Sequence, residues 1–288
     1  MENATIWWIT LSAASVVNMA VWAWMAVALT RTKAATDPEV YATRRRQLLL
    51  AGLFLLGCAF RSIVPRADVQ RIGFIDSWVS SVMLGRSVAT IAELCLAAQW
   101  ALLLREMARG AHAGVVVAIA RLVLPLIAVA EVCSWFAVLT TNYLGNACEE
   151  SIWALVSALL VVGLSMSWSQ HEGRARQYLS VAIFFNVAYF AFMCLVDVPM
   201  YLARWRADEA GGRAYLSLAD GWRDAAYRWV TTRSWQDWRE EIPWMSLYFT
   251  VGVWVSIALS RAPYSSHQAA PAGATRKPAL GSTAVVSR

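Results

Sequence analysis

Two glutamates lie inside long apolar stretches of the chain, where a carboxyl group is costly. Glu93 stands in SVATIAELCLAAQW and Glu131 in VAEVCSW. A charged side chain at the centre of a membrane-spanning helix costs about 2.5–3.5 kcal/mol on insertion scales, so each acid needs a partner or a hydrated cavity. Counting about 1.5 Å per helical residue puts both acids at one depth, roughly 12 Å from the same membrane surface. The spacing predicts a shared polar pocket, in which carboxyl groups suit proton transfer or the binding of a cation.

Other polar residues gather at that level or closer to the same surface. Arg61 and Arg86 would partly neutralise the two acids, and Asp197 comes near the end of the sixth apolar segment. Glu149 and Glu150 open the fifth segment, where a helix amino terminus would stabilise negative charge. We expect three catalytic carboxyl groups: Glu93, Glu131 and Asp197. We expect substrate to be bound by a second polar set: Arg61, Arg86, Asn142, Glu149, Glu150, Asn186 and Glu241.

A plainer interpretation exists for each of these residues. Arg61 with Glu93, or Arg86 with Glu131, could be interhelical pairs that only fix packing. Glu149, Glu150 and Glu241 could be ordinary acids at helix starts. Against this, charges spread through lipid would each carry the full burial cost, whereas charges around one cavity can share partners and water.

The chain that must position these residues has the composition of a multi-pass membrane protein. It has 288 residues, of which 59% are hydrophobic and 15% charged, whereas a soluble domain has about 25% charged residues. We predict an all-α bundle of seven transmembrane helices over residues 1–262. The apolar segments, each near the roughly 20 residues that a bilayer requires, are 6–30, 47–65, 79–104, 115–140, 150–168, 178–200 and 243–261. A Pro/Ala/Ser/Gly-rich stretch, 263–288, is predicted to be a disordered cytoplasmic tail.

The polar stretch 203–242 carries its own helical pattern. Trp222, Ala225, Ala226 and Trp229 recur at the spacing of one helix face. This pattern predicts an amphipathic helix in the extracytoplasmic membrane interface, which could act as a lid over the pocket. The alternative is a soluble helical hairpin that only connects two spans.

Basic residues in the short loops predict the orientation. The first, third and fifth loops together hold nine Lys and Arg residues, whereas the second and fourth together hold two. The excess of positive charge marks the cytoplasmic side, so we expect an extracytoplasmic amino terminus and a cytoplasmic carboxyl terminus. The arginine-rich 203–242 segment runs against this assignment.

Several classes of function are excluded by what the sequence contains. The formal charge of +6 is low for a nucleic-acid binder of this length. Lys33 and Lys277 lie in a loop and the tail, so no lysine within a span can form a retinal Schiff base. The three histidines lie outside the spans, and the five cysteines show no CxxC spacing. We therefore predict no metal site, and the sequence assigns neither a cofactor nor an oligomeric state.

Three classes of function remain for a protein whose expected partners are the lipid bilayer and a small cationic or lipidic substrate. The first is a membrane-embedded enzyme that transfers a group, such as a methyl group, to an amine, or that acts by acid catalysis on a lipid or isoprenoid. The second is a proton-coupled transporter or channel. The third is a seven-helix receptor or sensor.

Overall fold

The computed structural model describes residues 3–108 and 110–263, and it confirms an all-α bundle with seven helices long and apolar enough to cross a membrane. Five spans are single helices: α1 (Asn3–Arg31), α2 (Pro38–Ile63), α3 (Val82–Met107), α4 (Ala113–Thr140) and α5 (Tyr143–Trp168). The other two are interrupted. The sixth span joins α6 (Gly173–Phe192), a π-helical turn (Met193–Asp197) and α7 (Val198–Ala210), and the seventh joins α10 (Ile242–Leu247), a π-helical turn (Tyr248–Gly252) and α11 (Val253–Leu259). The predicted tail, apart from Pro263, lies outside the described residues.

Capping residues explain why some helices begin earlier than predicted. The Asn142 side chain accepts a hydrogen bond from the Leu144 backbone N–H at 2.9 Å, so α5 begins at Tyr143, seven residues before the predicted start. Such caps satisfy backbone donors that no helical carbonyl can reach. The prediction that Glu149 and Glu150 open this helix is therefore wrong, because both lie in its second turn.

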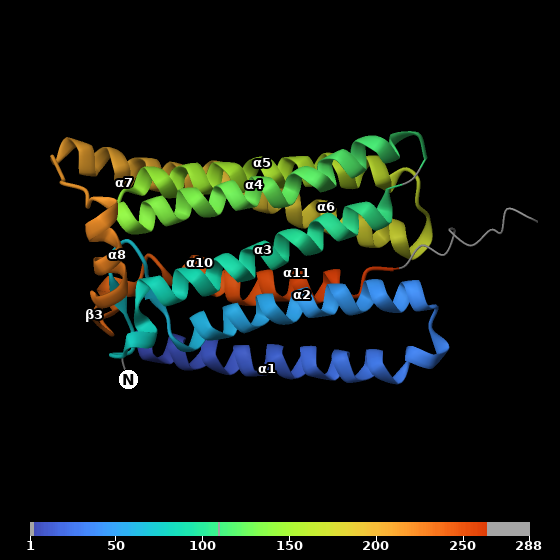
Figure 1. The fold of residues 1–288 in the computed structure, drawn as a ribbon, viewed down its shortest axis with the longest axis horizontal. Helices are drawn as coiled ribbons and strands as arrows, with labels where there is room; N and C mark the ends of the chain where they lie inside the picture. The colour runs from blue at the N-terminus through green and yellow to red at the C-terminus, as the bar shows by residue number, and fades with distance from the viewer. Residues whose placement is uncertain (1–2, 109, 264–288) are drawn as a thin grey trace, which may run out of the picture.

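The spans pack largely in chain order, each of the first five helices against the next, and α6 against α5. The seventh span returns to pack against α2, α3 and α1, so α3 lies near the centre of the bundle (Figure 1). The sixth span also differs from the prediction, because it does not end near residue 200 but continues through α7 to Ala210. This extension carries Arg204 towards the start of the seventh span.

One end of the bundle carries a small three-stranded sheet and is called the sheet end below. In the sheet, β1 (Arg66–Ala67) pairs antiparallel with β2 (Ile72–Gly73), and β2 pairs parallel with β3 (Val230–Thr231). Short helices lie beside the sheet: α8 (Leu218–Tyr227), α9 (Trp235–Trp238) and a 3-10 turn (Trp78–Ser80). Two more 3-10 turns connect spans elsewhere, Lys33–Ala35 and Gly110–His112. The described chain begins at the sheet end and finishes at the opposite end (Figure 1).

The predicted amphipathic helix is present as α8. Ala225 is fully buried against Val138 and Leu139 at the end of α4. Gly221 of α8 lies so close to α4 that an added Cβ would stand 2.2 Å from the Leu139 carbonyl oxygen. Trp229 lies beyond the end of α8, contrary to the predicted repeat. The location of α8 in the membrane interface stays a prediction.

Candidate functional site

The sheet-end half of the bundle contains a cavity of about 450 Å³. Residues of α2, α3, α4, α5 and both interrupted spans line it, with side chains from the loop that bears β1. Three arginines line it: Arg61, Arg86 and Arg204. Six carboxylates line it as well: Asp68, Glu93, Glu149, Glu150, Asp197 and Glu241. With the acids outnumbering the arginines, the cavity has the electrostatic character of a cation site.

Arg86 on α3 is the centre of a buried ion cluster. Its Nη2 lies 2.7 Å from a Glu131 carboxylate oxygen and 3.1 Å from one of Glu93, and its Nη1 lies 3.6 Å from one of Glu149. Thr90 donates a further hydrogen bond to Glu131 at 2.6 Å. The side chains of Arg86 and its three acids are 12% exposed at most. Buried charges of this kind are tolerated only when paired, so Arg86 is what allows three acids to lie together.

The same three acids have the arrangement of a metal-ligand set. Glu93, Glu131 and Glu149 each offer a carboxylate oxygen, and these oxygens lie within 4.8 Å of one another. Oxygen clusters of this type suit a hard cation such as Ca²⁺ or Mg²⁺. However, the Arg86 guanidinium already lies within ion-pair distance of all three carboxylates. We therefore interpret the three carboxylates as ion-pair partners of Arg86 and not as metal ligands.

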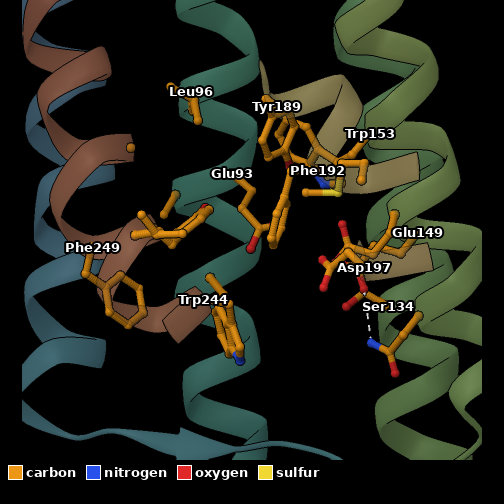
Figure 2. A pocket seen from close by; sticks show the side chains of 18 of the residues that line it. Glu93, Leu96, Ser134, Glu149, Trp153, Tyr189, Phe192, Asp197, Trp244 and Phe249 are labelled. Atoms are coloured by element: carbon orange, nitrogen blue, oxygen red, sulfur yellow. Dashed lines mark hydrogen bonds between the residues drawn. The ribbon is translucent and has the colours of Figure 1, made fainter. Parts of the chain in front are cut away.

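Glu150 and Asp197 differ from the cluster because neither forms a salt bridge with a described residue, although Arg86 acts electrostatically on Glu150 and Arg204 on Asp197. Within the described part of the chain, neither side chain makes an ion pair or a hydrogen bond, although both line the cavity. Figure 2 shows Asp197 beside Glu149, with the aromatic side chains of Trp153 and Phe192 next to them. Aromatic faces and carboxylates both attract organic cations.

The structure brings together most of the polar residues singled out in the sequence. Eight of the ten line the cavity: Arg61, Arg86, Glu93, Glu149, Glu150, Asn186, Asp197 and Glu241. Glu131 does not line it, but joins it through Arg86. Asn142 does not line it either, because its side chain caps α5. The suggested Arg61–Glu93 pair is not formed, since the Arg61 guanidinium lies beside Asp68 at 3.9 Å, whereas the Arg86–Glu131 pair is present.

Residues outside the apolar segments complete the sheet end of the cavity, and sequence reasoning missed them. Asp68 accepts a 2.6 Å hydrogen bond from the fully buried Arg66. Burial alone would raise the pKa of Asp68, but Arg66 and Arg61 outweigh that effect and lower it to about 2. Burial in turn lowers the pKa of Arg66 to about 10 against the attraction of Asp68.

Polar contacts also cross the cavity at its sheet end. Glu241 accepts a 2.9 Å hydrogen bond from Gln70 and a 2.6 Å one from the Trp244 indole, and lies 3.7 Å from Arg204. Of the predicted lid segment 203–242, Arg204 and Glu241 line the cavity, whereas the described residues 205–240, α8 among them, do not. The suggested lid motion of this segment stays a prediction.

The half of the bundle away from the sheet end holds a neutral polar cluster. Gln99 donates to the Gln47 and Ser256 carbonyls at 3.1 Å each, and its own side-chain oxygen accepts a 2.5 Å bond from the Ser256 hydroxyl. All three side chains are fully buried. Completely buried Leu103, Leu104 and Met107 follow on α3. The cavity therefore has no polar connection of described residues to this end.

Comparison of the chain with protein-family models, with curated proteins and with solved structures finds no match. The function must accordingly be argued from the site itself.

Proposed function

We propose that this protein is a membrane-embedded transferase that binds the amine of an amphipathic substrate and transfers a group to its nitrogen. The observation that carries the proposal is the excess of acids in the cavity, with Glu150 and Asp197 unpaired by any described cation. A carboxylate without a salt bridge in a low-dielectric site favours the binding of a positive charge far more than one in water does.

Glu150 and Asp197 would also move the proton that such a reaction requires. An ammonium group has no lone pair, so one N–H proton must pass to a carboxylate before the nitrogen can act as a nucleophile. The freed lone pair then forms a bond to the alkyl carbon of a sulfonium donor. The carbon–sulfur bond breaks, its electron pair stays on sulfur, and a neutral thioether leaves. The donor is positively charged, so the same acidic lining attracts it.

Trp153, Tyr189 and Phe192 would support this role by surrounding the nitrogen. Trp153 and Tyr189 meet edge to face with ring centroids 6.3 Å apart, and Figure 2 shows Phe192 next to them on the cavity side. Aromatic faces attract alkylated ammonium groups and exclude water. The Arg86 cluster would hold α3, α4 and α5 in register, since it joins one acid from each helix.

A carrier is less well supported because the described residues provide no polar path beyond Gln99. The buried cluster of Gln47, Gln99 and Ser256 would have to open for a charged solute to pass. A receptor would share the cavity but would need no proton transfer. These classes predict different outcomes in one experiment.

The experiment supplies membranes that contain the protein with dodecylamine and S-adenosylmethionine labelled in its methyl group. The proposal predicts labelled N-methyldodecylamine by mass spectrometry, and its loss in Glu150→Gln and Asp197→Asn proteins that still elute as folded species. Glu172→Gln, which removes an exposed acid elsewhere, serves as the control.

A rise in melting temperature with dodecylamine but no product would indicate a receptor. Uptake of the amine into proteoliposomes driven by a pH gradient would indicate a carrier. Variants that only reduce the amount of folded protein would indicate that the two acids serve packing alone. Any of these three outcomes contradicts the proposal.

A further inference from the structure

One wall of the cavity is exposed on the membrane-facing surface of the bundle. Phe184, Phe185 and Ala188 of α6 line the cavity and are also exposed, as are Leu247 and Val251 of the seventh span. These five apolar residues are called the seam below. They lie within spans, so their exposed surfaces face lipid. Phe184 is 67% exposed and Leu247 52%, although both reach the space that holds the acids.

Polar contacts join the two spans at each end of the seam but not along it. At the end away from the sheet, the Tyr178 hydroxyl donates to the Ala258 carbonyl at 3.2 Å. At the sheet end, Arg204 pairs with Glu240 at 2.9 Å. Between these two ties, the described residues of the sixth and seventh spans exchange no hydrogen bond or ion pair. Two helices tied at both ends, with no polar bond between those ties, can part there without losing one.

Both walls of the seam contain a π-helical turn. Met193–Asp197 interrupts the sixth span, and Tyr248–Gly252 interrupts the seventh. The first ends at Asp197, one of the two unpaired acids, and the second contains Val251 of the seam. Single π turns within helices are rare and occur frequently at functional sites. Their presence in both walls is independent of the charge argument and marks the same place.

The other approaches to the cavity are crossed by polar contacts. Gln70 and Arg204 both meet Glu241 across the sheet end. The neutral cluster around Gln99 fills the opposite end. The seam is the one approach, among the described residues, that is apolar and faces the bilayer.

We infer that the substrate is a long-chain amine that enters sideways from the bilayer through the seam. Its alkyl chain lies between α6 and the seventh span while its nitrogen reaches Glu150 and Asp197. The nine residues from Ala188 to Asp197 correspond to about 13 Å along a helix, so only an amphiphile with a long chain can occupy both places. This inference rests on the proposed function for the charged end of the substrate.

Photocrosslinking in nanodiscs tests the seam directly. The probe is a dodecylamine analogue with a diazirine at the end of its chain, and adducts are located by mass spectrometry of peptides. We expect adducts within 184–192 and 247–255 that excess dodecylamine removes. An Ala188→Trp substitution should fill the seam and lower these adducts about tenfold, a loss of about 1.4 kcal/mol in binding. Val187→Trp, also exposed on α6 but outside the cavity lining, should leave them unchanged.

Two results would overturn the inference. One is adducts confined to the sheet end, around residues 66–73 and 238–241. The other is seam adducts that Ala188→Trp leaves at the wild-type level. Because crosslinking needs no turnover, failure of the two proposals can be told apart. Seam adducts without any N-alkylated product would contradict the transferase alone, whereas product without seam adducts would contradict only the lateral route.

Discussion

The two halves of the bundle bury polar side chains in different ways. Away from the sheet end, Gln47, Gln99 and Ser256 are neutral and hydrogen-bond to one another, with only the Gln47 side-chain oxygen left without a partner among the described residues. In the same half, Arg44 pairs with Glu106 at 3.3 Å. In the sheet-end half, charged side chains surround a cavity, and two of them, Glu150 and Asp197, form no salt bridge or hydrogen bond with any described residue. Polar groups that hydrogen-bond to one another locally are explained by packing. Packing does not explain acids without a salt bridge around a cavity, and such acids indicate a binding site.

The largest effect is expected from removing the cation of the buried cluster. Arg86→Met leaves Glu93, Glu131 and Glu149 together without a positive charge, and breaking a buried ion pair costs about 3–5 kcal/mol. We expect little folded protein in detergent by size-exclusion chromatography and a strongly lowered melting temperature. Arg121→Met, on the exposed face of α4, should change neither. A normally stable Arg86→Met protein would show that the cluster does not hold the charged half together.

Lowering the pH should destabilise the sheet-end half of the bundle, because Asp68 becomes protonated. Its pKa of about 2 lies below the unfolded value of about 3.9, so Asp68 stabilises the fold above pH 4 and loses that contribution as the pH falls towards 2. The difference corresponds to about 2.6 kcal/mol. Asp68→Asn should therefore lower stability at pH 6 and match the wild type near pH 2, as measured by chemical unfolding at a series of pH values. A constant difference between the two proteins across that range would contradict the ion-pair role.

Changes in the neutral cluster around Gln99 should alter stability alone. Gln99→Met removes three hydrogen bonds of its side chain and leaves the buried Ser256 hydroxyl without its acceptor, which costs about 1–3 kcal/mol. Thermal unfolding should show the loss, and dodecylamine affinity should stay at the wild-type value. A change in dodecylamine binding free energy larger than the change in stability would contradict the separation of binding from this half of the bundle.

The smallest effect on stability, within about 0.5 kcal/mol, is expected from Glu150→Gln and Asp197→Asn. Neither acid makes a contact that the amide would break, and removing an uncompensated charge relieves a burial cost. The melting temperatures of both variants should agree with that of Glu172→Gln. A large destabilisation would show that these acids are structural.

Much of the site could be predicted from the sequence because depth along a spanning helix can be counted. Glu93 and Glu131 lie at one depth in neighbouring spans, and in the structure both bind Arg86. Counting fails where a residue leaves the regular helix. Asp68 lies in a loop between two spans, and its approach to Arg61 depends on how the chain folds back there.

Local capping and short elements limited the prediction of the fold. Asn142 begins α5 earlier than hydropathy suggested, which changed the places of Glu149 and Glu150. Strands of two residues, such as β1 and β3, carry too few residues for an alternating pattern to show. The π turns arise from backbone hydrogen bonding, which a hydropathy pattern does not report.

Isothermal titration of dodecylamine into protein-containing nanodiscs, with empty nanodiscs subtracted, tests the acidic cavity most directly. We expect saturable binding of about one amine per protein, weakened about tenfold or more in the Glu150→Gln/Asp197→Asn double variant, a loss of at least about 1.4 kcal/mol. Glu172→Gln should bind as the wild type does. Equal affinity in the double variant, or binding of dodecyl sulfate as tight as that of dodecylamine, would show that the cavity does not recognise a cation.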